Sequence, residues 1–510
     1  MTDVVERAPE TVSTRRPPLA VRPVAAIAVV AAAVLLFSAS RYGYFGDELY
    51  FLAAGRRPAW GYADQGPVVP MLARLMDTLA PGSYLVLRLP AVALTVAAIV
   101  LCAMLAREFG GNATAQALAA AGYATSPFLL LQGALLTTNA VDTVLWVIIT
   151  WLVARWVRTR NDLLLLAAAI VTAIDVQVKW LVPFLWIALA VSAVLCGPRG
   201  LVLRPMLWAG AGVAVLLSVP ELLWQSRRGW PEILMTQVIG GEQGILGGRL
   251  LFVPMTLELA GWLAGPLLVC GLVGFLLRKS LRPYRFLGVA WIVLELVFMI
   301  TGGRIYYSAG LDAVAIAAGA IVVVTAIGGQ PAVPRHLLTA GVLTVVGGAA
   351  FYVLRATPWL PAERVEPPRS NSEAAIAISV YGKFGWPELS DAVVDAYRRL
   401  PDADRAHAVI IADTYWQASA LDELARDRLP PIYSPSRGWG YFGAPPDDAS
   451  VYLVVGSYEL VLQSQFGEVT PIGLVDTRLG FPGNTQQVTL WRCTGLLKSW
   501  ADVWPDWMHL

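Results

Sequence analysis

Long apolar runs recur along most of this 510-residue chain, and they constrain its fold more than any other feature. Between residues 23 and 355 they follow one another with short polar breaks. Each run has about 20 residues, enough for a helix to cross a hydrocarbon layer about 30 Å thick. Charged residues make up only 15% of the chain, against about 25% in soluble proteins. The sequence therefore predicts an α-helical polytopic membrane protein.

Hydropathy and length predict about eleven membrane-spanning helices. An arginine-rich start followed by an apolar run is also typical of a cleaved signal peptide, but the many later runs favour an uncleaved first helix. The fifth and sixth predicted spans are short and nearly continuous. The spans are placed at residues 23–40, 83–106, 113–131, 137–154, 163–179, 181–197, 205–222, 252–277, 286–301, 308–327 and 337–355.

The distribution of Lys and Arg predicts how the spans are oriented. Positive residues concentrate in alternate short loops, beginning with the N-terminal tail, residues 1–22. Short loops rich in Lys and Arg stay in the cytoplasm. We therefore expect a multi-pass protein of the cell membrane, with a transmembrane domain at 23–355 whose first outer loop is 41–82. An odd number of spans places residues 356–510 outside the cytoplasm.

Proline, charge and turn residues return after the last apolar run. Helical patterns appear at 388–400 and 414–428, and strand-like runs appear at 408–412, 451–455 and 487–491. This order predicts a small extracytoplasmic α/β domain with a mixed sheet.

Composition excludes several classes of function. The net charge of +2 does not indicate nucleic acid as a partner. The four cysteines and three histidines lack the spacing of a Cys/His metal site. Acid–base chemistry would therefore fall to carboxylates.

Acidic residues gather in the first outer loop. Asp47 and Glu48 stand in an aromatic, glycine-rich stretch just after the first span, and Asp64 follows in a turn-like segment. A carboxylate at the membrane surface can accept a proton or, as a pair such as Asp47 and Glu48, hold a divalent cation. The simpler interpretation is a solvated loop with interfacial aromatic residues. Residues 45–55 and 67–80 are predicted to form short helices that lie along the interface and shape a groove.

Three motifs follow one another along the chain. They are Phe45-Gly-Asp-Glu-Leu-Tyr50 followed by Gly61-Tyr-Ala-Asp-Gln-Gly-Pro67, then Pro220-Glu-Leu-Leu-Trp-Gln-Ser-Arg-Arg-Gly-Trp-Pro231, and Gly303-Arg-Ile-Tyr-Tyr307. They resemble motifs of glycosyltransferase family 39, the dolichyl-phosphate-mannose-protein mannosyltransferase-like proteins related to lipid A aminoarabinose transferase. The resemblance covers about residues 25–320, with Arg228 where the family usually has His and Arg304 where it usually has Lys.

The resemblance implies a fold, a donor and a catalytic residue. The fold is the multi-span C-type glycosyltransferase (GT-C) fold, and the donor is a polyprenyl-phosphate-linked sugar used on the outer side of the membrane. Asp47 matches the family's catalytic acidic position. Glu48 and Asp64 would support it, bind acceptor or help hold a cation. The substitutions at Arg228 and Arg304 leave donor and acceptor preferences open.

A lipid-linked donor needs positive groups near its departing phosphate. Arg304, beside Tyr306 and Tyr307, could grip that phosphate bidentately or act only as an interfacial anchor. Lys179 could reach the phosphate as well, or simply neutralise Asp175 one helical turn away.

The remaining polar candidates could contact the acceptor or serve only the structure. They are Asn139, Asp142, Trp224 and Arg228. The acceptor itself, whether protein, lipid or cell-wall glycan, is not readable from the sequence.

A secondary transporter or flippase is the alternative from another class, and a noncatalytic membrane scaffold is a third. Transporters are commonly built from two related halves with broken helices at matching positions, and the sequence has no such internal repeat. Consumption of a lipid-linked sugar would favour the enzyme, and movement of an intact solute would favour the transporter.

Overall fold

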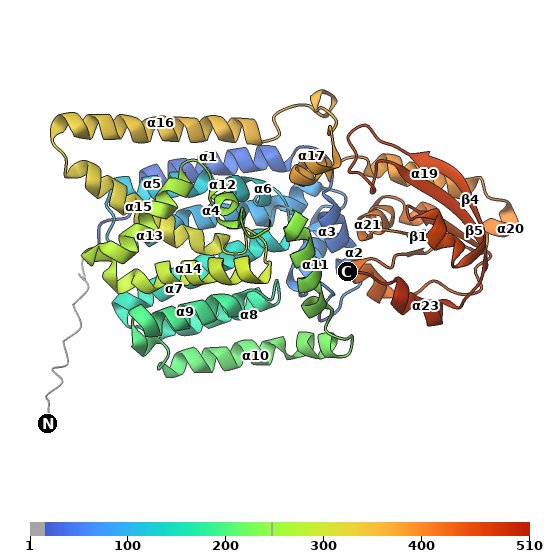
Figure 1. Cartoon of the computed structure of the whole chain (residues 1–510), viewed down its shortest axis with the longest axis horizontal. Coiled ribbons are helices and arrows are strands. Elements are labelled where there is room, and N and C mark those ends of the chain that lie inside the picture. Colours follow the sequence, from blue (N-terminus) through green and yellow to red (C-terminus); the bar gives the residue numbers. More distant parts are fainter. Residues whose placement is uncertain (1–15, 246–247) are drawn as a thin grey trace.

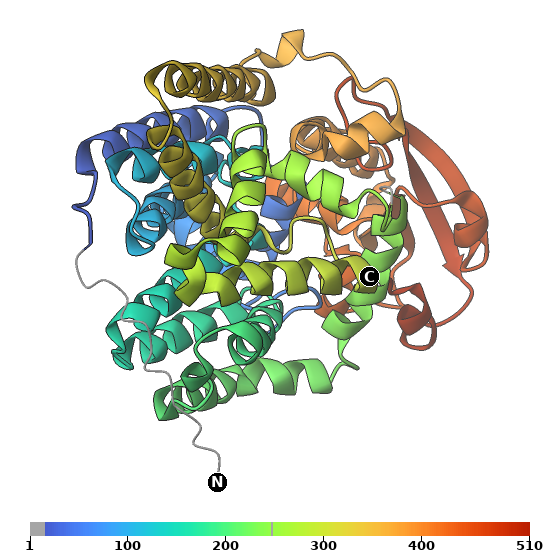
Figure 2. The same ribbon diagram turned by 60° about the vertical axis from the view of Figure 1, so that its left-hand side comes forward.

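Helices packed side by side form the larger part of the molecule, and a small sheet domain is attached at one end of the bundle (Figure 1, and Figure 2 for a turned view). The computed structural model describes residues 16–245 and 248–510. We call the end of the bundle that carries the sheet domain the domain end. The first described residues, 16–20, lie at the opposite, or tail, end (Figure 1).

All eleven predicted spans coincide with a helix or with two consecutive helices. The bundle contains α1 (Val21–Ala39), α4 (Tyr84–Glu108), α5 (Ala113–Ala124), α6 (Pro127–Gln132), α7 (Thr138–Thr159), α8 (Leu163–Val176), α9 (Val182–Cys196), α10 (Pro205–Ser226), α12 (Phe252–Ala260), α13 (Ala264–Leu277), α14 (Arg285–Thr301), α15 (Ala309–Gly328) and α16 (Ala332–Ala356).

The number of eleven spans, however, is not confirmed. Within the described residues, seven helices are long and apolar enough to cross a membrane, or eight if α12 and α13 form one broken span. The helices α8 and α9 have 14 and 15 residues, which gives each a length of only about 21–23 Å. The predicted third span is interrupted between α5 and α6, where Pro127 begins a new helix.

Small residues let the central helices approach closely. A Cβ atom added to Gly271 of α13 would lie 1.8 Å from the carbonyl oxygen of Ala315, and one added to Gly319 of α15 would lie 1.8 Å from that of Leu267. Backbone contact of this kind is common where helices pack within a membrane. Twelve consecutive residues, from Ala309 to Ala320, are buried in α15.

Two short helices lie at the domain end, where the sequence predicted interfacial helices. These are α2 (Gly46–Gly55) and α3 (Val68–Leu79). The apolar side chains of Met71, Leu75 and Leu79 are exposed on α3, and its other face is buried. An amphipathic helix with these properties suits the surface of a membrane. The helix α11 (Pro231–Ile245) lies at the same end (Figure 1).

The C-terminal region contains the predicted mixed sheet, with strand order β2-β1-β3-β5-β4. The strand β1 runs parallel to β2 and β3, whereas β5 runs antiparallel to β3 and β4. Both α19 and α21 pack with the sheet, and α22 and α23 follow β3 and β5 in the chain. The bounds are α19 (Trp386–Arg398), β1 (Ala408–Ala412), α21 (Tyr415–Leu424), β2 (Ile432–Tyr433), η5 (Arg437–Phe442), β3 (Val451–Val455), α22 (Glu459–Gln463), β4 (Phe466–Val475), β5 (Val488–Leu496) and α23 (Trp500–Trp507).

One hydrophobic cluster joins the sheet domain to the helix bundle. It includes Leu49 of α2 and Val178 on the bundle side, with Leu421 and Trp439 on the domain side. The contact between α2 and α21 is so close that a Cβ atom on Gly46 would lie 2.1 Å from the Trp416 ring. The segments that follow β1 and β2 therefore rest directly on the loop between α1 and α4.

Candidate active site

Asp47 stands in the first turn of α2, directly below the sheet domain. Its Oδ1 atom accepts hydrogen bonds of 2.8 Å from the Tyr415 hydroxyl and from Nε1 of Trp416. Its Oδ2 atom makes no hydrogen bond with any described residue, and the side chain is only half-buried. One carboxylate oxygen is thus held by the sheet domain, and the other has no hydrogen-bond partner among the described residues.

Glu48 has a different environment although it is the next residue. Its carboxylate is fully buried and binds Arg88 through two hydrogen bonds of 2.7 and 2.8 Å. It also accepts from the backbone N–H groups of Phe45 and Leu136. Both oxygens of Glu48 are therefore occupied by the protein, which leaves neither of them for a shared cation with Asp47.

Asp64 lies near Asp47 on the loop between α2 and α3. The Tyr50 hydroxyl donates to its Oδ1 atom at 3.0 Å, and Arg437 lies 4.0 Å from its Oδ2 atom. Burial raises the pKa of Asp64, while Arg437 and the Tyr50 hydrogen bond oppose the rise and the charge of Asp47 adds to it. The charge of Asp47 is therefore close enough to influence the ionisation of Asp64.

Arginines from two parts of the chain converge beside these acids. Arg304 pairs with Glu242 of α11. Arg437 lies 3.6 Å from the same carboxylate and places its guanidinium 4.8 Å from the centre of the Tyr415 ring. A single carboxylate thus lies between two guanidiniums, both of which are partly accessible.

Lys179 adds a third positive group, from the turn after α8. Its ammonium donates to Asn139 at 2.8 Å and lies 4.3 Å from the centre of the Tyr307 ring. Asp175 and Asp142 are buried in the neighbouring helices, and their charges act on Lys179. Lys179 is therefore oriented by Asn139 and Tyr307 instead of forming a simple pair with Asp175.

Tyr306 connects the two halves of the cluster. Burial raises its pKa, Arg304 and a hydrogen bond with Asn139 oppose that rise, and the charges of Asp47 and Glu242 add to it. The Tyr306 ring also stacks on Phe128, at 5.3 Å between ring centres. Residues far apart in the sequence, Asp47 and Arg304 among them, therefore share one site.

Trp224 and Arg228 lie at the edge of this site. The Arg228 guanidinium stacks on the Trp224 ring at 4.3 Å, and Trp224 packs beside Tyr441. The side chain of Arg228 is exposed. Arg228 and Trp224 therefore contact each other and Tyr441, and not the cluster of acids and cations.

Metal ligands are sparse here. Across residues 16–245 and 248–510, no group of three or more His, Cys, Asp or Glu side chains is arranged to hold a metal ion. Asp47 and Glu48 were the predicted metal ligands. The Glu48 carboxylate is occupied by its salt bridge with Arg88 and is not free to bind a metal ion.

Comparison with known proteins bears on the family and the fold of this chain. Residues 64–224 match the family model described as dolichyl-phosphate-mannose-protein mannosyltransferase. About a third of the chain therefore resembles this glycosyltransferase family. The resemblance predicted from the three motifs is thus confirmed, and the comparison with curated protein sequences found no match.

Solved structures share the fold of this chain. ArnT from Cupriavidus metallidurans, crystallised with undecaprenyl phosphate, superimposes with a TM-score of 0.59 at 14% identity, covering 92% of this chain and 98% of that one. Its apo structure gives a TM-score of 0.57 at 14% identity, with coverage of 93% and 98%. An Archaeoglobus fulgidus oligosaccharyltransferase reaches only 0.46 at 14% identity, covering 78% and 63%, too low to compare folds.

Sequence reasoning missed four residues of this candidate site, namely Tyr415, Trp416, Arg437 and Glu242. The first two follow β1 and the third follows β2, two parallel neighbours in the sheet. Functional side chains commonly lie beyond the carboxyl ends of parallel strands. That rule, applied to the predicted strand at 408–412, would have drawn attention to Tyr415 and Trp416.

Proposed function

We propose that this glycosyltransferase moves a sugar from a polyprenyl-phosphate donor to an acceptor hydroxyl outside the cytoplasm, with Asp47 as the base. The acceptor oxygen forms a bond to the anomeric carbon, and the bond from that carbon to the phosphate oxygen breaks. The electron pair leaves with the phosphate, and the acceptor proton passes to Asp47. The observation that carries this proposal is the cluster of Asp47 with three cationic side chains.

The environment of Asp47 suits a base better than that of Glu48. A base must come within hydrogen-bond reach of the proton that it removes. The Oδ2 atom of Asp47 is available for that contact, while Tyr415 and Trp416 fix the orientation of the carboxylate. Glu48 is buried and saturated, and it acts by holding the start of α2 in place.

Arg304, Arg437 and Lys179 suit the phosphate end of the reaction. Guanidinium groups bind phosphate through paired hydrogen bonds, and an ammonium adds a point charge. Positive groups fixed in advance stabilise the charge that develops on a departing phosphate. A polyprenyl donor also keeps its tail in lipid, and ArnT, which has the same fold, was crystallised with undecaprenyl phosphate.

The side of the membrane is tested by a fused reporter. Basic residues of the tail end include Arg107, Arg158, Arg278 and Arg285, and short basic loops favour the cytoplasm. A reporter that works only outside the cytoplasm should therefore be active when it is joined after Leu510. A reporter that works only in the cytoplasm should be inactive at the same position. Cytoplasmic activity would contradict the proposed orientation and place Asp47 on the wrong side.

Removal of Arg304 should weaken use of the donor. Arg304→Ala loses a charge-assisted hydrogen bond to phosphate, which costs about 1.5–3 kcal/mol, or roughly 10- to 150-fold in donor KM. Arg304→Lys should recover part of this loss, because the charge remains while the planar fork is lost. The measurement is the initial rate against donor concentration.

Arg249→Ala is the matched control for Arg304→Ala. Arg249 is exposed at the same end of the bundle and donates only to the backbone carbonyl of Ile300 among the described residues. If both variants keep the wild-type donor KM, Arg304 is an anchor and plays no part in donor binding.

A further inference from the structure

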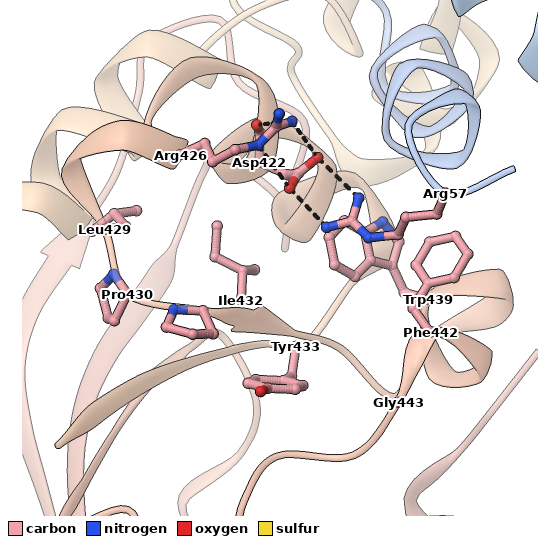
Figure 3. Close-up of a pocket in the computed structure, with 11 residues that line it drawn as sticks. Arg57, Asp422, Arg426, Leu429, Pro430, Ile432, Tyr433, Trp439, Phe442 and Gly443 are labelled. Atoms are coloured by element: carbon pink, nitrogen blue, oxygen red, sulfur yellow. Dashed lines mark hydrogen bonds and ion pairs between the residues drawn. The ribbon is translucent and has the colours of Figure 1, made fainter.

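A cleft lies beside the C-terminal part of α21, about two helical turns from Tyr415. It has a volume of about 450 Å³, within the range of ligand-binding pockets. Arg57, from the loop after α2, contributes one wall, and the sheet domain contributes the others (Figure 3). The lining residues are Arg57, Asp422, Arg426, Leu429, Pro430, Pro431, Ile432, Tyr433, Trp439, Phe442 and Gly443.

Two guanidiniums and one carboxylate form the polar wall of this cleft. Arg57 donates to the two oxygens of Asp422 at 2.9 and 3.1 Å, and Arg426 donates to the same carboxylate at 2.9 Å (Figure 3). Burial alone would raise the pKa of Asp422, but Arg57 and Arg426 together lower it below its ordinary value. Asp422 is therefore ionised, and the polar wall keeps one excess positive charge.

Part of each guanidinium remains available. The Nε atom of Arg57 and one terminal nitrogen of Arg426 make no hydrogen bond within the described parts of the chain. The Arg57 guanidinium also stacks on Trp439 and Phe442, at 4.7 and 5.2 Å from their ring centres. Asp422 and these rings hold the cations in place before any ligand arrives, which suits recognition of an anion.

The opposite wall is apolar and belongs to the edge of the sheet. Ile432 and Tyr433 form β2, the outermost strand, and Pro430 and Pro431 precede it. A peptide could add to this edge only through backbone hydrogen bonds, and proline has no N–H group to donate. The cleft therefore suits a polar ligand that binds through its own side groups better than it suits an added peptide strand.

Two elements connect this cleft to the reaction site. The helix α21 begins with Tyr415, which holds Asp47, and reaches Asp422 seven residues later, about 10 Å along its axis. The short helix η5 begins with Arg437 beside Asp64 and continues to Trp439, whose Nε1 donates to Ser419 of α21 at 2.7 Å. A ligand in the cleft would thus have a fixed position relative to the reacting groups.

We propose that the cleft binds an anionic part of a glycan acceptor, at a distance from the hydroxyl that receives the sugar. This inference rests on the proposed function, and it narrows the acceptor to a saccharide with carboxylate or phosphate groups. Arg57 and Arg426 bind the anion, and the apolar edge beside Tyr433 packs against the sugar rings.

The test is binding of defined oligosaccharides to the full-length protein in lipid nanodiscs, with no donor present. An oligogalacturonate is the anionic probe, a neutral maltooligosaccharide of equal length is its control, and an acidic peptide represents the alternative acceptor. Isothermal titration calorimetry should show that the wild type binds the oligogalacturonate at least tenfold more tightly than either of the others. Arg426→Gln should weaken that binding roughly tenfold or more.

Arg428→Gln is the matched control for Arg426→Gln. Arg428 is two residues away and similarly exposed, but it pairs with Asp391 outside the cleft. Three results would overturn the proposal. The wild type fails to bind the oligogalacturonate, the Arg426→Gln and Arg428→Gln variants bind it equally well, or the acidic peptide binds more tightly than the oligogalacturonate. Asp47→Asn should bind the oligogalacturonate normally. If the oligogalacturonate binds in a way that depends on Arg426 but no sugar is transferred, the result would therefore count against the proposed function. The assignment of the cleft as an anion-binding site would still stand.

Discussion

Asp47→Asn should fold normally and lose about 100- to 10,000-fold in the rate of sugar transfer, the usual contribution of a general base. Asparagine has almost the same shape as aspartate, and its side-chain oxygen can still accept from Tyr415 and Trp416. It cannot take the proton of the acceptor hydroxyl. The loss should therefore appear in kcat, measured with a synthetic polyprenyl-phosphate sugar, while donor binding changes little.

Asp64→Asn is the comparison for Asp47→Asn. Asp64 is a neighbouring carboxylate that accepts from Tyr50 and lies near Arg437, so its loss should disturb the site without removing the base. We expect its rate to fall between those of the wild type and Asp47→Asn. Near-wild-type turnover by Asp47→Asn, at equal protein level, would remove Asp47 from the mechanism and make Asp64 the next candidate.

Glu48→Gln should have its large effect on stability instead of on the chemical step. The change removes the charge that balances Arg88, a fully buried guanidinium. Breaking a buried ion pair from one side costs about 3–5 kcal/mol, because the remaining charge stays buried without its partner. The measurement is thermal unfolding of the purified protein in nanodiscs, together with the transfer rate per folded molecule.

The double variant Glu48→Gln/Arg88→Met is the control for this assignment. It removes both charges, so its loss of stability should be smaller than the sum of the losses in the two single variants. The structural role would be contradicted if Glu48→Gln unfolded at the wild-type temperature but transferred less sugar per folded molecule. Glu48 would then take part in the chemical step.

Local patterns made much of the fold predictable. Hydropathy located the helices of the bundle, and two helical segments too short or too polar to span a membrane predicted α2 and α3. Apolar runs matched β1 and β3 residue for residue. These features depend on neighbouring residues, which is why sequence periodicity reports them. The number of spans depends on helix length and bending, which hydropathy does not measure, and it was not confirmed.

Contacts across the chain made the rest of the site unpredictable. Tyr415 meets Asp47 across a sequence separation of 368 residues, and no local pattern specifies that pairing. The adjacent acids Asp47 and Glu48 looked equivalent in the sequence. Successive residues of a helix point in different directions, so one carboxylate faces the site and the other is buried against Arg88.

The most direct test of the account is the fate of the donor. Purified protein in liposomes would be given a synthetic polyprenyl-phosphate sugar together with an oligosaccharide acceptor, and the release of free polyprenyl phosphate would be measured. The account predicts release by the wild type and a loss of about 100-fold or more in Asp47→Asn. The account would be contradicted if the donor stayed intact with the wild type and with Asp47→Asn. Movement of the unaltered lipid-linked sugar between the two leaflets would then identify a flippase.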